Sequence, residues 1–328
     1  MSFDEIKGHE RPLRLIKAML AAGRLPHALL LSGPAGVGKR TLALALAQAV
    51  NCLNPRSGEP CGVCLSCDKI IRGLHPDVEE IAPEGKARLI KIESVRDLRT
   101  RIAYKPYEGR CKVFIVREAD RMKEEQANAL LKTLEEPPPQ SLLILTTPEE
   151  SDLLPTMVSR CLRLSLAPLP RALVEDWLKM RRGLMGPRAR LLASMSGGCL
   201  GRVKDVSPDE FWNRRQEIVS RLGTLDARRL EPALKWAAEL AAGESGWPDL
   251  FSLLRFWYRD LMILSGIGGE ERLMNQDLAG QLKTAAAGRR CDDFRAALAA
   301  VDRAEDALNR FIRPELVFEN LLLALAEI

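Results

Sequence analysis

The feature that most constrains this chain is a glycine-rich stretch, residues 33–41, which reads GPAGVGKRT. An apolar run, residues 28–31, precedes it, and a segment rich in alanine and leucine follows it. This order of strand, loop and helix is typical of a phosphate-binding loop, in which backbone N–H groups and the helix N-terminus face a phosphate. Lys39 is placed to reach the outer phosphates. The loop glycines are Gly33, Gly36 and Gly38.

The positions that would hold Mg²⁺ depart from this pattern. A hydroxyl should follow the loop lysine, but Arg40 stands there, and Thr41 does not replace it because one more helical residue turns a side chain by about 100°. After the next buried strand, Val113–Val116, Arg117 takes the place of a metal-holding aspartate, although Glu118 keeps that of a water-activating glutamate. We expect either an empty site or one that holds ATP or ADP without hydrolysis, and no Mg²⁺.

A third apolar strand, residues 142–145, ends at Thr146 and Thr147, whose hydroxyls we expect to face the same site. Strands that alternate with helices predict an α/β fold with a mostly parallel sheet, and ligands at the carboxyl ends of its strands.

Four clustered cysteines follow the helix after the glycine loop. They are Cys52, Cys61, Cys64 and Cys67. Two CxxC steps that share Cys64, with one further cysteine, supply four thiolates for one tetrahedral ion, so we expect a structural Zn²⁺ site. Free thiols are the alternative. A catalytic zinc is not expected, because four cysteines leave no position for water. The scattered cysteines, Cys111, Cys161, Cys199 and Cys291, are interpreted as small core residues.

The charge balance permits an acidic partner without requiring one. The chain has 49 Lys and Arg against 44 Asp and Glu, a net charge of +5. Basic residues concentrate between Lys86 and Lys112, where Arg96 and Arg99 lie on the polar side of a predicted helix. This surface is either a solvated helix face or a contact for DNA backbone or an acidic subunit. No signal segment and no apolar run of the roughly 20 residues needed to span a membrane is visible, so we expect a cytoplasmic protein.

Beyond residue 168 the strand pattern gives way to helices. Apolar side chains recur at helical spacing at Phe251, Leu254, Trp257, Tyr258 and Leu261. We interpret this stripe as core rather than as a stacking platform for bases, because no basic residues are interleaved with it.

Five features together carry a family resemblance. They are the glycine loop, the four-cysteine insert, His75-Pro76-Asp77, Asn128 to Pro138, and Ser159-Arg160-Cys161. The chain resembles the AAA+ clamp-loader subunits of bacterial DNA polymerase III, with specific motifs over residues 1 to about 207 and by helical character and length beyond. The resemblance implies an AAA+ domain over 1–166 with a zinc insert at 52–67, a helical lid over 167–207, and an all-α oligomerisation collar over 208–328.

The resemblance also implies partners and a role. The partners would be the tau/gamma and delta subunits, the sliding clamp and primer-template DNA, with no membrane. Arg160 matches an arginine finger that acts in trans on ATP bound to a neighbouring subunit, and Arg202 matches a lid arginine that faces the chain's own nucleotide. Within the family, Arg40 and Arg117 favour a stator subunit without ATPase activity of its own. Such a subunit would be a component of the DNA polymerase III complex, and that complex as a whole is a nucleotidyltransferase.

Two other functions remain as alternatives. The first is an ATP-hydrolysing motor of the tau or gamma kind. The second is an independent zinc and DNA-binding module, which would bind duplex DNA as a monomer with a steep salt dependence.

Overall fold

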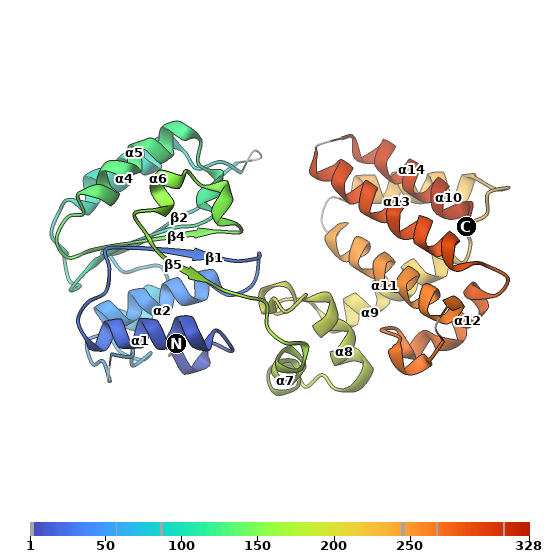
Figure 1. The fold of residues 1–328 in the computed structure, drawn as a ribbon, viewed down its shortest axis with the longest axis horizontal. Coiled ribbons are helices and arrows are strands. Elements are labelled where there is room, and N and C mark those ends of the chain that lie inside the picture. Colours follow the sequence, from blue (N-terminus) through green and yellow to red (C-terminus); the bar gives the residue numbers. More distant parts are fainter. Residues whose placement is uncertain (1–2, 57, 86–87, 244–246, 267, 311) are drawn as a thin grey trace. The chain divides into compact units, whose positions relative to one another are not determined.

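The computed structural model describes residues 3–56, 58–85, 88–243, 247–266, 268–310 and 312–328 (Figure 1). The chain divides into two compact units. The first consists of Met1–Leu173 with Gly198–Arg202, and the second of Val174–Gly197 with Val203–Ile328. The division into three parts, with boundaries at 166 and 207, stays a prediction.

A five-stranded parallel sheet forms the first unit, in the order β2-β3-β4-β1-β5. The strands are β1 (Ala28–Ser32), β2 (Val78–Ile81), β3 (Lys112–Val116), β4 (Ser141–Thr147) and β5 (Leu162–Ser165). The predicted α/β class and parallel sheet are confirmed. The sequence prediction missed β2 because its four residues include two glutamates and only Ile81 is buried, so no apolar run marks it.

Helices cover both faces of this sheet (Figure 1). They are α1 (Glu10–Ala21), α2 (Lys39–Asn51), α3 (Leu65–Ile71), α4 (Ile92–Ile102), α5 (Glu124–Glu135) and α6 (Pro155–Val158). In β1, Leu29 and Leu31 pack in one core cluster with α1 and α2, while Ala28 and Leu30 pack in the other with α4 and α5. This alternation explains why β1 reads as a continuous apolar run, since both of its faces are buried.

The register of the sheet gathers three strand ends at one edge. Ser32 of β1 lies opposite Thr147 of β4, and Val116 of β3 lies opposite Leu145 of β4. Because the strands are parallel, the glycine loop and the segments after β3 and β4 all leave the sheet on the same side, where such sheets bind ligands.

The second unit is helical in the part of the chain that is described. Its helices are α7 (Arg171–Arg182), α8 (Gly186–Met195), α9 (Pro208–Leu222), α10 (Glu231–Ala242), α11 (Trp247–Gly266), α12 (Ala279–Ala286), α13 (Cys291–Asn309) and α14 (Pro314–Ala326). The apolar stripe on α11 is buried, as predicted for core, and the Phe251 ring stacks on Phe318 of α14 with centroids 6.2 Å apart. Among the described residues, no helix is long and apolar enough to cross a membrane.

The prediction for the scattered cysteines is confirmed in part. Cys199 is buried in the core of the first unit, and Cys111 and Cys161 are half-buried. The prediction is wrong for Cys291, which is exposed because it occupies the first position of α13, where a side chain has no preceding helical turn to pack against.

Candidate functional site

The glycine loop between β1 and α2 adopts backbone conformations that only glycine accepts readily. Gly33 has φ +137°, and a Cβ there would lie 2.2 Å from the carbonyl oxygen of Leu166. Gly36 has φ +81°, and a Cβ there would lie 3.2 Å from the backbone nitrogen of Arg202. Gly38, with φ +118°, is the N-cap of α2. The predicted loop is therefore formed, and the end of β5 and the turn at Arg202 close around it.

The Lys39 side chain folds back onto its own loop. Its ammonium group donates to the carbonyl oxygens of Gly33 and Pro34, the latter at 3.0 Å. Burial lowers the pKa of this ammonium below its ordinary value, while the negative charge of Asp120 acts in the opposite direction. Lys39 thus lies where a phosphate would be bound, but its ammonium group donates its hydrogen bonds to carbonyl oxygens of the protein.

Arg40, which stands at the first predicted Mg²⁺-ligand position, forms an ion pair. Arg40 donates from Nε and Nη2 to the two carboxylate oxygens of Glu80, a residue of β2, at 2.7 and 2.6 Å. Arg117 follows β3 directly, and its backbone N–H donates to the carbonyl of Ile81 at 2.8 Å. A guanidinium has no acceptor atom for a cation, so neither side chain can coordinate Mg²⁺.

Glu118, at the place of a water-activating glutamate, is also engaged. Both of its carboxylate oxygens accept from Arg88 at 2.7 Å. Its backbone N–H donates to the hydroxyl of Thr146 at 3.0 Å, whereas the hydroxyl of Thr147 donates to the carbonyl of Glu149 at 2.7 Å. Of the two threonines, Thr146 therefore contacts the segment after β3, and Thr147 is bonded within its own loop. Thr41 lies half-buried in the first turn of α2.

Two residues near the loop were not singled out from the sequence. Asp120 is largely buried, its Oδ1 has no partner among the described residues, and burial raises the pKa of its carboxyl group. It belongs to the acidic run after β3, which was the available signal. His9 lies within hydrogen-bond distance of the Val37 carbonyl, with Nε2 and the oxygen 3.1 Å apart. Nothing in the sequence connects two residues so far apart along the chain.

The arrangement at the loop fits an anion better than a metal ion. The N-terminus of α2, the three glycines and Lys39 are the groups that bind phosphate in such loops, and Arg202 lies against Gly36. The two positions at which the sequence pattern predicts Mg²⁺ ligands, Arg40 and Arg117, carry guanidinium groups instead of oxygen ligands. The residues present therefore fit a nucleotide phosphate and do not fit Mg²⁺.

Arg160 lies elsewhere in the first unit, in the turn between α6 and β5. Its Nη2 is 2.7 Å from Oε1 of Glu135, and its Nη1 donates to the Thr156 carbonyl at 2.9 Å and to the Ser159 hydroxyl at 3.3 Å. The side chain is 36% exposed. Since β5 is an edge strand of the sheet, Arg160 lies beside a border of the first unit.

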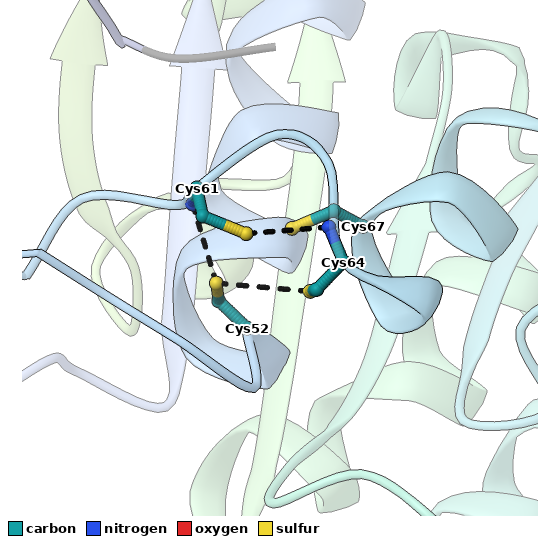
Figure 2. Close-up of side chains that lie close together, drawn as sticks. All are labelled: Cys52, Cys61, Cys64 and Cys67. Carbon is teal, nitrogen blue, oxygen red and sulfur yellow. Dashed lines mark hydrogen bonds between the residues drawn. The ribbon is translucent and has the colours of Figure 1, made fainter.

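The four clustered cysteines converge at the other end of α2 (Figure 2). Their sulfur atoms all lie within 4.8 Å of one another, and the Cys52 and Cys64 sulfurs are 3.9 Å apart. Four thiolates about 2.3 Å from one Zn²⁺ at the corners of a tetrahedron would be separated by about 3.8 Å. The predicted set is therefore brought together, with sulfur separations close to those of a single tetrahedral ion.

Backbone N–H groups point at these sulfurs. The N–H of Cys61 donates to the Cys52 sulfur at 3.2 Å, and the N–H of Cys64 donates to the Cys61 sulfur at 3.3 Å. Burial raises the pKa of Cys52 and of Cys67. Backbone N–H donors lower the pKa of Cys61, and although burial acts to raise the pKa of Cys64, such donors and its cysteine neighbours lower it to about 6. Such donors favour the thiolate form, which is the form that binds a metal.

The C-terminal end of α2 is held by buried polar side chains. Asn51 accepts from the backbone N–H groups of Arg110 and Cys111 at 2.8 and 2.9 Å. Asp77 accepts from three further N–H groups of the same loop, those of residues 107, 108 and 109, at 2.7 to 2.8 Å. The His75-Pro76-Asp77 motif is therefore a structural support for the loop before β3, a role that the sequence did not reveal.

The basic surface predicted around α4 is partly neutralised within the chain. Arg96 and Arg99 are exposed, as expected. Arg96 lies 3.6 Å from Glu125, and Arg101 lies 2.7 Å from Glu79. Lys86, where the predicted surface begins, lies outside the described residues.

Comparison with known proteins gives consistent results. Residues 8–170 match the family model described as DNA polymerase III, delta subunit. The chain is 31% identical over 324 residues to DNA polymerase III subunit delta′ of Bacillus subtilis, which covers 97% of this chain and 96% of that protein. It is 35% identical over 235 residues to DNA polymerase III subunit tau of Escherichia coli, covering 69% of this chain but only 36% of that protein.

A similarity at the level of structure is weaker. The crystal structure of a DNA polymerase III gamma subunit-related protein from Thermotoga maritima aligns with 96% of this chain and 99% of its own. The TM-score is 0.45 at 20% sequence identity.

Proposed function

Because the chain belongs to the family of DNA polymerase III delta prime subunits, we propose that it is a non-hydrolysing stator of the clamp loader. In this role it gives Arg160 to ATP bound by a neighbouring tau/gamma subunit and works beside the delta subunit. The assembled complex places the sliding clamp on primer-template DNA in the cytoplasm. The chain's own loop holds ATP or ADP without hydrolysing it.

The observation that carries this proposal is that the chain's own glycine loop lacks the predicted Mg²⁺ ligands. The hydroxyl and the aspartate that would serve Mg²⁺ are both arginines, and Arg40 is paired with Glu80. Phosphoryl transfer depends on the ion to bridge the phosphates and neutralise developing charge, and on a free carboxylate to activate water. Glu118 is paired with Arg88 and is not free for that task.

Arg160 is suited to act outside its own subunit. Its ion pair with Glu135 is between partly exposed side chains, 36% and 49%, so breaking it costs about 1 kcal/mol or less. A γ-phosphate carries more charge than one carboxylate and accepts two N–H groups from a guanidinium. The phosphate of a neighbouring subunit therefore competes well for Arg160, and an arginine supplied in trans accelerates phosphoryl transfer by about 10³-fold or more.

The test is the ATPase rate of the clamp loader reconstituted with an Arg160→Ala variant. We expect assembly to be retained and the rate to fall by up to about 10³-fold, because the transition-state charge loses one partner. Arg163→Ala is the matched control, since Arg163 is an exposed arginine three positions along that lies 3.7 Å from Glu150. Equal rates for wild type and Arg160→Ala would remove the arginine-finger assignment.

A tau or gamma motor is the second candidate, because Lys39 and Glu118 are retained and the chain is 35% identical to a tau subunit. This candidate requires Mg²⁺-dependent ATP hydrolysis by the purified chain that Lys39→Ala abolishes. Such activity would overturn the stator proposal, whereas an inactive chain beside an active complex supports it.

We also assign a structural Zn²⁺ to Cys52, Cys61, Cys64 and Cys67. The ion would supply a cross-link between the end of α2 and the start of α3, with no catalytic step. The spacing of the four sulfurs supports this assignment.

A further inference from the structure

A cavity in the second unit is not used by the proposed function. It lies between the C-terminal half of α9, the middle of α11, helix α12 and the end of α14, and has a volume of about 680 Å³. Cavities of roughly 300 to 1,000 Å³ with apolar walls and a few polar groups are the usual size for small-molecule sites. The cavity is therefore large enough for a compact organic ligand.

The walls of this cavity are about half apolar and half polar. Leu222 of α9, Trp257 and Leu261 of α11 and Leu325 of α14 line it. Trp257 and Leu261 are buried, so they belong to the core while still bordering the cavity. An aliphatic or aromatic body of a ligand would find dispersion contacts here and would leave water.

An arginine side chain, that of Arg289, lies at one side of the cavity. Among the described residues that line it, Arg289 is the one with a charged side chain. Arg289 lies in the segment after α12. Its Nη1 donates to the Ala285 carbonyl at 3.2 Å, and its other guanidinium N–H groups make no hydrogen bond to the described residues. The cavity therefore combines apolar side chains with uncharged polar ones, such as Gln216 and Gln281, and with one cationic side chain.

Beside this cation lies Tyr258, a mostly buried residue that lines the cavity. Tyr258 is only 5% exposed, and its hydroxyl makes no hydrogen bond to the described residues. Burial raises the pKa of this phenol, with the charge of Arg289 acting against the shift, so the hydroxyl stays protonated and is a donor. An oxygen of a ligand in the cavity can therefore accept a hydrogen bond from this hydroxyl.

We propose that this cavity binds a small amphipathic anion, in which an apolar body lies against Trp257 and a carboxylate, sulfonate or phosphate accepts from Tyr258 and Arg289. The site lies wholly within the second unit and shares no residue with the glycine loop, the cysteine cluster or Arg160. Whether this cavity binds such an anion is therefore independent of the proposed clamp-loader role.

The probe is 8-anilinonaphthalene-1-sulfonate, which has an aromatic body and one sulfonate and fluoresces when bound. With the full chain we expect saturable binding at one site. Arg289→Gln should weaken it about tenfold, because a charge-assisted hydrogen bond is lost, and Tyr258→Phe by about threefold. Arg303→Gln is the matched control, since Arg303 is exposed on α13 and does not line the cavity. Thermal melts of each variant establish that it is folded.

Competition defines the ligand class. Decanoate should displace the probe, while decanol, which has the same body without the charge, should displace it at least about tenfold less well. Non-saturable binding, equal binding by wild type and Arg289→Gln, or equal competition by decanoate and decanol would overturn the proposal.

Discussion

Helix α2 has a ligand-binding motif at each end, and the two ends differ in what satisfies their polar groups. At the N-terminal end, Lys39 donates to two carbonyls of its own loop and Arg40 is paired with Glu80. At the C-terminal end, four sulfur atoms from Cys52 to Cys67 converge within 4.8 Å of one another. At the first site the cationic side chains have partners within the protein itself, whereas the second site has four sulfur atoms placed for one ion.

This difference shows that a motif can keep its backbone while its chemistry changes. The glycines at 33, 36 and 38 retain their left-handed conformations, because the end of β5 and the turn at Arg202 pack directly against the loop. At the two positions where Mg²⁺ ligands are expected, Arg40 and Arg117 stand instead. In the cysteine cluster, all four positions carry a thiol, which is a complete set of ligands for one tetrahedral ion.

The largest expected effect concerns the cysteine cluster. We expect one zinc per chain by metal analysis, and loss of that zinc in Cys64→Ser. The free energy of unfolding should fall by at least about 3 kcal/mol, because structural zinc binding is itself folding free energy. Denaturant unfolding with and without a chelator measures this loss.

Cys291→Ser is the matched control for this experiment, since Cys291 is exposed and lies outside the cluster. It should keep its zinc and its stability. A native protein without zinc, or a chelator that leaves the stability unchanged, would show that the cysteine cluster at the C-terminal end of α2 is not completed by an ion.

A smaller effect is expected at Asp77, which holds the loop next to the C-terminal end of α2. Asp77→Asn should lower the free energy of unfolding by about 2 kcal/mol at neutral pH, because a carboxylate that accepts three N–H groups loses its charge and one acceptor. Burial acts to raise the pKa of Asp77, but these N–H groups lower it below its ordinary value.

The pH dependence follows from the lowered pKa. The advantage of wild type over Asp77→Asn should be complete above the ordinary aspartate pKa of about 3.9, and should be lost as pH falls below it through the lower folded value. Urea unfolding of both proteins across this range measures the difference. Asp97→Asn, an exposed position on α4, is the control that should lack this pH dependence. A constant difference across the range would contradict the role of the Asp77 charge.

The smallest expected effect concerns the N-terminal end of α2. Binding of ADP to wild type should depend little on Mg²⁺, because both metal positions are arginines. In the double variant Arg40→Thr with Arg117→Asp, we expect Mg²⁺ to strengthen binding about tenfold, or about 1.4 kcal/mol. Calorimetry with and without the ion measures this change. Arg96→Thr is the control, and a strong Mg²⁺ requirement in wild type would mean that Arg40 and Arg117 do not exclude the ion.

Local patterns predicted most of the first unit correctly. The loop after β1, the parallel sheet and the convergence of Cys52 with the CxxC steps all follow from spacing within a short segment. The helices of the second unit and the buried stripe on α11 follow from periodicity. The strand β2 was missed because its sequence, Val-Glu-Glu-Ile, carries no apolar run, and it forms a strand only because β3 lies beside it.

The sequence alone determined where the glycine loop and the cysteines lie and which Mg²⁺ ligands are missing, since these depend on residue type and short-range spacing. Only the tertiary structure decided which partners those side chains have. Arg88 meets Glu118 across 30 residues, because parallel pairing of β2 with β3 brings the segments after these strands together. Arg40 of α2 meets Glu80 of β2 across 40 residues, because both elements belong to the same sheet unit. The same is true of the cavity beside Tyr258, whose walls come from four helices that are far apart along the chain.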